Sequence, residues 1–250
     1  MIVKAPNLTP APVIPRGLPE AELITYIAEA KYLLGKPLYR MEQHFKMQGI
    51  YLNRTSLANW IIKSSEWLKS VVNHFWKYAY LEPVLNADET TLRVLKIHGK
   101  PVKKLGQMWV VCTGASAKLL IAIYTYRDNR SKMTAEELLG SYDGIVQTDG
   151  FQSYGSGEYL HAGCWSHARR KFVDSIPEND KNSQAAKAVE IIDRAFALER
   201  EARKANYSPE KLMKMRQKEV KPIIEEFYSF IGTLKPSKGS HLGAAVINLQ

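Results

Sequence analysis

The first part of the chain repeats apolar residues at helical spacing. Between residues 19 and 34, apolar side chains recur as on the buried face of an amphipathic helix. The same spacing predicts helices at residues 38–48, 54–62 and 65–80. The last of these is rich in aromatic residues, and at helical spacing aromatics favour a packed core over a platform for nucleic-acid bases. These aromatic residues are Trp67, Phe75, Trp76 and Tyr78.

From residue 82 the pattern changes to that of β-strands, because β-branched and aromatic residues alternate or run together. Strands in hairpin order, followed by a short helix and a buried strand, are typical of an α/β fold with a mixed sheet of the ribonuclease H-like kind. The predicted strands cover residues 84–87, 91–97, 108–112, 119–126 and 144–148, and the short helix covers residues 134–139, capped by Ser131 or Thr134.

Helical spacing returns after Phe172. It predicts helices at residues 183–206 and 209–231, the second broken by Pro222, and the start of another at 241–250. The chain is therefore expected to divide into four parts. These are a proline-rich linker at 1–18, an all-α helix-turn-helix region at 19–81, the sheet core at 82–175 and a helical extension at 176–250.

Two of the N-terminal helices have the arrangement of a DNA-binding helix-turn-helix. A short turn that contains Gly49 separates residues 38–48 from 54–62, and Thr55 or Ser56 is suited to begin or cap the second helix. In this interpretation the second helix presents polar side chains to DNA. An ordinary helical hairpin fits the spacing equally well. The side chains assigned to DNA are Asn53, Arg54, Ser56 and Asn59.

Composition limits the class of protein. The 250 residues are 45% hydrophobic, enough for a sizeable core, and the formal net charge of +10 favours a polyanionic partner over an acidic protein. A basic balance alone is weak evidence, because many soluble proteins share it. Two cysteines exclude a disulfide framework, and no apolar run approaches the roughly 20 residues that span a bilayer. A cytoplasmic protein without a membrane association is expected.

Two aspartates follow apolar strands and are candidates for metal ligands. Asp88 follows the strand at 84–87, and Asp149 follows the strand at 144–148. Phosphodiester transfer with two Mg²⁺ or Mn²⁺ ions, about 3.5–4 Å apart, requires carboxylates that converge from separate elements. A single aspartate at a strand end is more often a turn former or a helix cap. Glu89 is expected to point away from Asp88, because side chains alternate along a strand.

Longer phrases around these aspartates resemble, in order, the insertion sequence 66 family of DDE transposases. Upstream phrases look like the helix-turn-helix of that family, so the resemblance runs from about residue 14 to 250. The phrases around the aspartates are Asp88-Glu89-Thr90, Gly106-Gln107-Met108-Trp109-Val110, Gln147-Thr148-Asp149-Gly150-Phe151-Gln152-Ser153-Tyr154 and Gly163-Cys164-Trp165-Ser166-His167-Ala168-Arg169-Arg170-Lys171-Phe172. The upstream phrases are Pro37-Leu38-Tyr39-Arg40-Met41-Glu42-Gln43 and Ser56-Leu57-Ala58-Asn59-Trp60.

The resemblance implies that Asp88 and Asp149 are the first two members of an acidic triad that binds two Mg²⁺ or Mn²⁺ ions. The third residue of the acidic triad in that family, a glutamate in an Asp-Asn-Asn-x-x-Glu-Arg phrase, has no counterpart here. Residues 240–245 look like the stretch just ahead of that phrase, and the cysteine-rich segment that commonly begins the family is also absent. Both ends are therefore expected to be trimmed.

The last phrase carries further candidates. Cys164 and His167 lack a second ligand pair for a structural zinc site. By resemblance they lie near the acidic cluster and support it; alternatively, they are a buried thiol and a hydrogen-bonded imidazole. Arg169, Arg170 and Lys171 are candidate phosphate contacts, and the alternative is a solvated helix face.

Two functional hypotheses follow. In the first, a transposase cleaves and joins insertion-sequence ends with two metal ions and without a covalent protein–DNA intermediate. In the second, the chain is a DNA-binding remnant that lacks one metal ligand and performs no chemistry. A host nuclease is a third hypothesis, and the phrase at residues 163–170 argues against it. DNA, a second copy of the chain and accessory proteins of the element are the expected partners, in association with a bacterial nucleoid.

Overall fold

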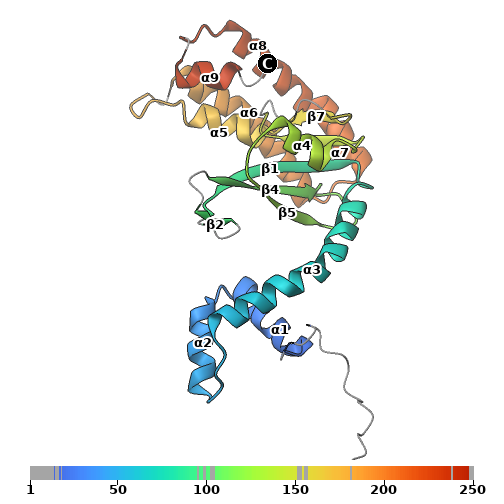
Figure 1. Ribbon diagram of the computed structural model, residues 1–250. Helices are drawn as coiled ribbons and strands as arrows, with labels where there is room; N and C mark the ends of the chain where they lie inside the picture. The colour runs from blue at the N-terminus through green and yellow to red at the C-terminus, as the bar shows by residue number, and fades with distance from the viewer. Residues whose placement is uncertain are drawn as a thin grey trace, which may run out of the picture. The chain divides into compact units, whose positions relative to one another are not determined.

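The structure of the protein is a computed structural model. This structure describes residues 14, 17, 19–94, 96–97, 100–101, 105–150, 154, 157–180, 182–237 and 239–247. The predicted linker at 1–18 therefore lies outside the described residues, apart from two positions. The chain forms two compact units, residues 1–78 and 79–250, which are described separately (Figure 1).

The first unit is a small helical cluster. Helix α1 (Ala21–Ala28) continues into a π-helical turn at Glu29–Leu33, and α2 (Leu38–Met47) and α3 (Arg54–Ala79) follow. Apolar side chains from all three helices meet in one core, as the helical spacing predicts. The buried members are Ile14, Ile24, Ile27, Ala30, Met41, Phe45, Leu57 and Trp60.

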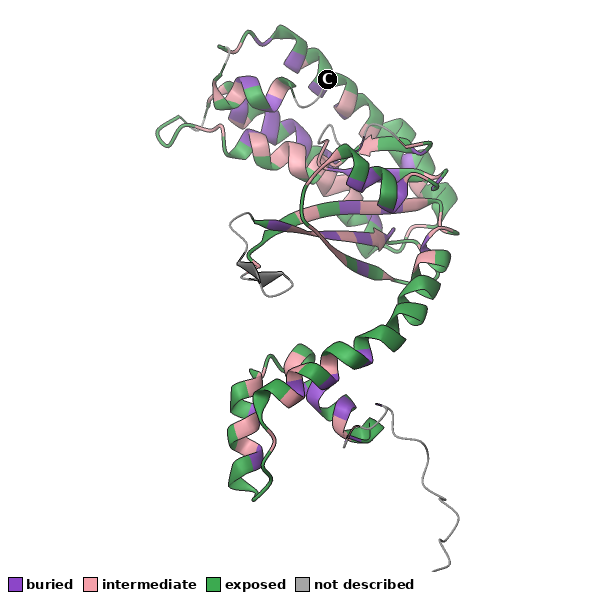
Figure 2. Cartoon of the chain, in the orientation of Figure 1, coloured by how far each residue is buried: buried purple, intermediate pink, exposed green. Residues whose placement is uncertain are grey.

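Helix α3 corrects two predictions. It is one continuous helix where the sequence predicted two, and no glycine or proline interrupts its residues. Its predicted core aromatics are not buried: Trp67, Phe75 and Tyr78 are exposed and Trp76 is partly buried. Figure 2 shows this second half of α3 as almost entirely exposed. Helical spacing identified the stripe correctly but could not show whether another element covers it.

The second unit is built on a mixed five-stranded sheet with the order β5-β4-β1-β6-β7. Strand β4 is antiparallel to both of its neighbours, whereas β6 is parallel to β1 and β7 is parallel to β6. A separate pair, β2 (Lys96–Ile97) with β3 (Lys100–Pro101), forms a two-stranded sheet. The five strands are β1 (Val84–Leu92), β4 (Gly106–Thr113), β5 (Ala122–Arg127), β6 (Ile145–Thr148) and β7 (Leu160–Gly163).

The predicted strands need two corrections. The predicted strand at 91–97 does not exist as one element, because β1 extends to Leu92 and only the short β2 follows. Strand β7 was missed, because its residues Leu160–Gly163 include a glycine and a histidine and no β-branched side chain. It forms through parallel pairing with β6, which a local pattern does not encode.

Different helices lie on the two faces of the sheet. Leu85, Trp109 and Val146 are buried on one face, where the Trp109 indole donates to the backbone oxygen of Asn129 just before α4 (Lys132–Leu139). Helix α4 is capped by Ser131, one of the two residues predicted to do so. On the other face, residues of β1 and β4 share a cavity with the start of α5 (Trp165–Val173).

Helices that follow α5 in the chain form a second core of the unit together with Phe172 of α5. Helix α6 (Gln184–Lys204) has the predicted extent, but the predicted break at Pro222 is instead a π-helical turn, Arg216–Val220, between α7 (Pro209–Met215) and α8 (Lys221–Thr233). Phe172 of α5 meets Phe227 of α8 edge to face at 5.8 Å, and α9 (His241–Ile247) also contacts α5. Among the described helices, none has the length and apolarity that a membrane crossing requires.

Candidate active site

Asp88 and Asp149 occupy equivalent levels on two neighbouring parallel strands. In the β1–β6 pair, Asn86 lies opposite Gln147, and each aspartate comes two residues later in its own strand direction. Adjacent strands lie about 4.8 Å apart, and residues two apart on a strand share a face. The topology therefore brings the two predicted carboxylates to the same level of the sheet, with Asp149 one residue beyond the end of β6. Asp88 lies in the middle of β1 and not after its end as predicted, because β1 continues to Leu92 through its pairing with β4.

The turn after Asp149 depends on glycine. Gly150 has φ = 81°, a conformation that is costly for residues with a side chain. Its N–H donates to the hydroxyl of Thr148 at 3.1 Å, and the buried Thr148 hydroxyl also contacts Nε2 of His161 on β7 at 2.6 Å. The main chain therefore leaves β6 in a defined direction immediately after the candidate ligand.

Asp88 lies half exposed beside the first turns of α5. One carboxylate oxygen, Oδ2, is 3.7 Å from Nε2 of His167, and the other accepts the N–H of Glu89 at 2.9 Å. Both side chains line a cavity of about 160 Å³, together with Cys112 and Cys164. Within the described structure the buried Nδ1 of His167 has no hydrogen-bond partner. The structure thus brings His167 to Asp88, as the family resemblance implied.

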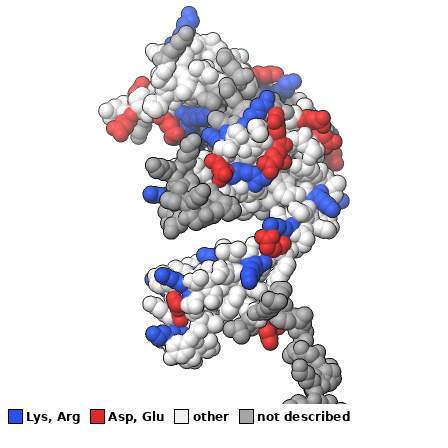
Figure 3. All heavy atoms as spheres, viewed as in Figure 1, with Lys and Arg blue, Asp and Glu red and all other residues white. Residues whose placement is uncertain are grey.

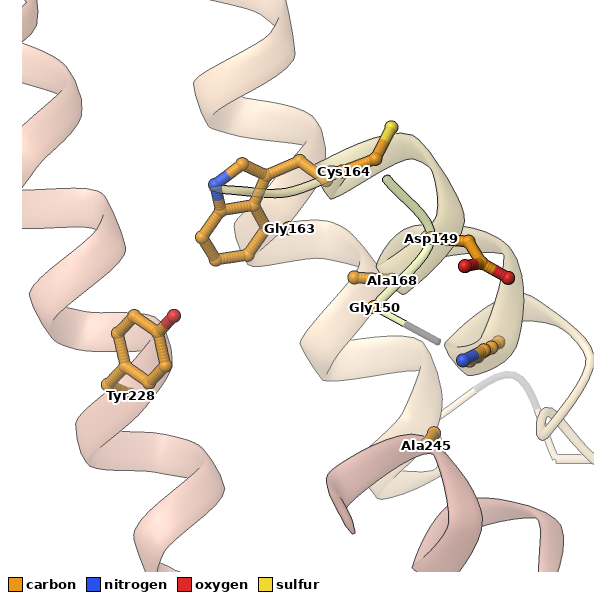
Figure 4. Close-up of a pocket in the computed structure, with 9 residues that line it drawn as sticks. Asp149, Gly150, Gly163, Cys164, Ala168, Tyr228 and Ala245 are labelled. Atoms are coloured by element: carbon orange, nitrogen blue, oxygen red, sulfur yellow. The ribbon is translucent and has the colours of Figure 1, made fainter. Parts of the chain in front are cut away.

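Asp149 lines a second cavity, of about 240 Å³ (Figure 4). Cys164 borders both cavities, because its N–H donates to the backbone oxygen of Thr148 at 2.8 Å and fixes the start of α5 beside the end of β6. Tyr228 of α8 and Ala245 of α9 line the far side of this cavity (Figure 4). Lys171 of α5 also lines it, so a cation lies at the site with the carboxylate.

Glu89 takes the opposite face of β1, as strand alternation predicts. It pairs with Trp109 in the sheet register, and only 1% of its side chain is exposed. The buried carboxylate accepts hydrogen bonds from Nε of Arg130 and from the hydroxyl of Tyr154. The Arg130 guanidinium also donates through Nη2 to Oδ2 of Asp149 at 3.1 Å. Glu89 is therefore joined to Asp149 through one arginine.

Sequence reasoning did not find this network. Arg130 stands in a polar loop between β5 and α4, and nothing in the local sequence indicates that it reaches two carboxylates from different strands. Burial and the neighbouring Glu89 carboxylate raise the pKa of Tyr154, so its hydroxyl stays protonated and donates to Glu89.

The three cations predicted to contact phosphate have different surroundings. Arg169 forms two hydrogen bonds with Asp193 of α6, at 2.5 and 2.9 Å. Arg170 is exposed and borders a cavity of about 400 Å³ with Arg200, whereas Lys171 faces the Asp149 cavity. On the face seen in Figure 3, cations and carboxylates are interspersed in both units. A uniform basic surface is thus not present on that face of the described structure.

The Arg169–Asp193 pair predicts a pH effect on stability. The hydrogen bond from Arg169 lowers the pKa of Asp193, so its stabilising contribution is complete above the unfolded-state pKa, about 3.9, and is lost as the pH falls through the folded-state value. We expect the difference in Tm between the wild type and Asp193→Asn to be constant above about pH 5 and to shrink below about pH 4. Thermal melts followed by circular dichroism measure this difference.

The matched control removes the cation instead. In an Arg169→Gln background, the change in Tm caused by Asp193→Asn should depend much less on pH, because the carboxylate has lost the partner that lowers its pKa most. A Tm difference that stays constant to pH 3 in the wild-type background would contradict the assignment.

The donor atoms at the sheet end fit the first two ligands of a hard divalent cation. Carboxylate oxygens suit Mg²⁺ or Mn²⁺, whereas the Cys164 thiol does not. Across the described part of the chain, no three His, Cys, Asp or Glu side chains gather closely enough to hold a metal ion. The geometry therefore supplies a pair of aspartates and not a complete cage.

The candidate DNA contacts of the first unit lie on α3. Arg54 and Asn59 are both exposed, but the side chain of Asn53, also assigned to DNA, accepts the N–H of Ser56 at 2.8 Å and so caps the helix. Thr55 and Ser56 lie in the first turn of α3, so of the two roles predicted for them they begin the helix and do not cap it. Gly49, with φ = 80°, ends α2 in the left-handed conformation that its position predicts.

The chain is similar to a known protein family and to several curated proteins. The model of the family described as "Transposase IS66 family" matches residues 16–250. The uncharacterized protein y4qI of Sinorhizobium fredii is 33% identical over 184 residues, which cover 67% of this chain and 34% of that protein. The uncharacterized protein y4jD of the same organism is 28% identical over 249 residues, 94% of this chain and 47% of that protein. The chain thus spans about a third to a half of the curated relatives it matches.

Proposed function

Because the chain belongs to the IS66 family of transposases, we propose that it cleaves and joins DNA at the ends of an insertion sequence. The observation that carries this proposal is that Asp88 and Asp149 each lie two residues beyond the paired residues Asn86 and Gln147 of two adjacent parallel strands. Carboxylates that converge from separate elements suit hydrolysis or transfer at a phosphodiester, where a polyanionic substrate approaches metal ions.

The sheet order supports a ribonuclease H-like core. Three antiparallel strands, β5, β4 and β1, are followed by two parallel strands, β6 and β7, on the other side of β1. In such an order the central strand β1 contributes one acidic residue and the parallel neighbour β6 the other. This arrangement agrees with the assignment of Asp88 and Asp149 as catalytic carboxylates.

Asp88 and Asp149 would hold Mg²⁺ or Mn²⁺. When bound, such ions activate a water or a 3′-hydroxyl for attack and stabilise the leaving oxygen. His167, 3.7 Å from Asp88, orients that carboxylate, and Cys164 fixes the start of α5 between the two aspartates. Lys171, in the Asp149 cavity, is placed to attract a phosphate of the substrate.

The first unit is proposed to bind DNA through a helix-turn-helix. The glycine-ended α2, the capped start of α3 and the exposed Arg54 and Asn59 support this role. A transposition reaction joins two element ends, so we also propose that copies of the chain act together on DNA, with or without accessory proteins of the element.

The test is nicking of a labelled duplex that carries the element's end, with Mg²⁺ or Mn²⁺ and with EDTA. We expect binding in both conditions and cleavage only with the metal. Cleavage that proceeds equally in EDTA would contradict a carboxylate–metal mechanism. The family match and the sheet topology make this assay more informative than a general screen for nuclease activity.

DNA binding without cleavage is the second candidate function. It is favoured by one observation, that among the described residues no three His, Cys, Asp or Glu side chains lie close enough together to hold a metal ion. Salt-sensitive binding in the same assay, with no nick at any metal concentration, would support this function for these 250 residues.

The basic end of α5 predicts a salt effect. Replacing Arg170 or Lys171 by glutamine should each lower the slope of log K against log salt by about 1, because each is proposed to neutralise one phosphate. Fluorescence anisotropy with a labelled duplex at several salt concentrations measures the slope. Lys214→Gln on α7 is the matched control, and a decrease of equal size in that variant would contradict a specific role for α5.

A further inference from the structure

The loop before α4 places a cation between two carboxylates that belong to opposite faces of the sheet. Arg130 binds the buried Glu89 through Nε and Oδ2 of Asp149 through Nη2, the latter at 3.1 Å. Its side chain is 34% exposed, that of Glu89 is 1% exposed and that of Asp149 is 22% exposed. The guanidinium thus links the buried Glu89 carboxylate to the candidate metal ligand Asp149.

The Glu89 carboxylate is held in place by Tyr154 and by the aromatic residues that contact Tyr154. Glu89 accepts the Tyr154 hydroxyl, the Tyr154 ring meets Trp109 edge to face at 5.6 Å, and the Tyr159 hydroxyl bonds the Tyr154 backbone. An aromatic cluster therefore surrounds the carboxylate to which Arg130 is attached. A buried, fully bonded carboxylate of this kind holds its partner in one geometry.

The main chain that carries Arg130 is equally constrained. On one side, the backbone oxygen of Asn129 accepts a hydrogen bond from the Trp109 indole. The side-chain oxygen of Asn129 accepts hydrogen bonds from the N–H of Ser131 and the hydroxyl of Thr134. On the other side, Ser131 is the N-cap of α4. Arg130 therefore starts from a fixed backbone position and ends on a fixed carboxylate.

We infer that Arg130 is a positioning residue for Asp149, held by Glu89 so that the second metal-binding carboxylate keeps one orientation. The inference rests on the proposed function, because it needs Asp149 to be a metal ligand. The Arg130 guanidinium donates a hydrogen bond to Oδ2 of Asp149. Carboxylates that bind metals are commonly oriented by hydrogen bonds from residues that do not touch the metal.

Charge balance allows a cation to serve this purpose beside a metal ion. An unpaired arginine would repel a divalent cation, but the Glu89 carboxylate neutralises Arg130 at the same contact. The pair as a whole adds no net charge near Asp149. A role of Arg130 through its charge and a role through positioning of Asp149 therefore predict different changes in Mn²⁺ affinity when Arg130 is replaced.

The decisive variant is Arg130→Gln, which removes the guanidinium and its hydrogen bond to Asp149. If Arg130 acted only through its charge, the variant would bind Mn²⁺ equally well or more tightly, because a positive charge beside Asp149 is removed. If Arg130 positions Asp149, the variant should bind Mn²⁺ about 10- to 100-fold more weakly. The free Mn²⁺ signal in electron paramagnetic resonance measures the affinity of the 250-residue chain directly, without DNA or activity.

Two further variants separate positioning from misfolding. Glu89→Gln/Arg130→Gln removes both charges of the pair and should weaken Mn²⁺ binding by the same factor, with less loss of Tm than Arg130→Gln. Arg127→Gln is the matched control, because that arginine is also partly exposed and makes a forked pair, but with Glu137 on the surface of α4. It should leave Mn²⁺ affinity within about two-fold of the wild type.

The outcomes distinguish this inference from the proposed function. Weaker Mn²⁺ binding in Asp149→Asn and in both Arg130 variants supports the positioning role. Loss of binding in Asp149→Asn, with unchanged or tighter binding in the folded Arg130 variants, overturns the positioning role and leaves the metal site standing. Equal Mn²⁺ binding by the wild type and Asp149→Asn overturns the metal site, and the positioning role with it.

Discussion

Asp149→Asn is expected to abolish Mg²⁺-dependent nicking of an element end, with the rate lowered at least about 10³-fold. Asparagine keeps the size of the side chain but loses the charge that holds a hard cation, and Asp88→Asn on the neighbouring strand should have the same effect. DNA binding in EDTA should persist or become slightly tighter, because a negative charge has been removed near the substrate. Single-turnover nicking and anisotropy in parallel measure the two quantities.

The control for this experiment replaces Asp143, which precedes β6 at the end opposite to Asp149. Asp143→Asn changes an exposed aspartate just before the opposite end of β6, so it removes one charge without touching the sheet end that carries the site. It should nick DNA at the wild-type rate. Nicking by Asp149→Asn at a rate within ten-fold of the control would mean that Asp149 is not a metal ligand.

Phe227→Ala is expected to cause the largest loss of stability, about 3–5 kcal/mol in the free energy of unfolding. Phe227 is fully buried in α8 and meets Phe172 and Trp165, both of α5, edge to face at 5.8 and 5.2 Å. Truncation leaves a cavity between these helices and removes both aromatic contacts. Urea denaturation followed by circular dichroism measures the loss as a shift of the midpoint.

The comparison is Tyr124→Ala, which truncates an exposed aromatic residue on the edge strand β5 and should cost less than about 1 kcal/mol. A loss in Phe227→Ala no larger than this would show that the helical core does not hold α5. Because α5 carries Cys164, His167 and Lys171, the same variant should also loosen the two cavities at the sheet end.

The features that the sequence predicted correctly are those with a local cause. The apolar run at β6 followed by Asp149, the N-cap Ser131 of α4 and the glycine at the end of α2 each depend on neighbours within a few residues. The position of Asp149 directly after a strand was equally readable, whereas Asp88 was predicted to follow a strand and instead lies in the middle of β1. Their common level required the parallel register of β1 and β6.

The features that were missed depend on contacts between distant residues. Strand β7 exists because β6 offers a parallel partner, not because of its own composition. Arg130 was missed because its two carboxylates come from β1 and from the turn after β6. Likewise, the exposed aromatics of α3 have the spacing of a buried face, and only the packing of other elements decides whether such a face is covered.

The sheet order also sets the sequence in which the site can assemble as the chain folds. Strands β1, β4 and β5 pair in hairpin order and can form early, because the connections that join them are shorter than the one between β1 and β6. The β1–β6 pair must close a loop of many more residues, from Leu85 to Val146, before Asp149 reaches Asp88. A folding intermediate with the hairpin strands alone would carry one aspartate and no partner, so metal affinity should appear only in the last, slow phase of refolding.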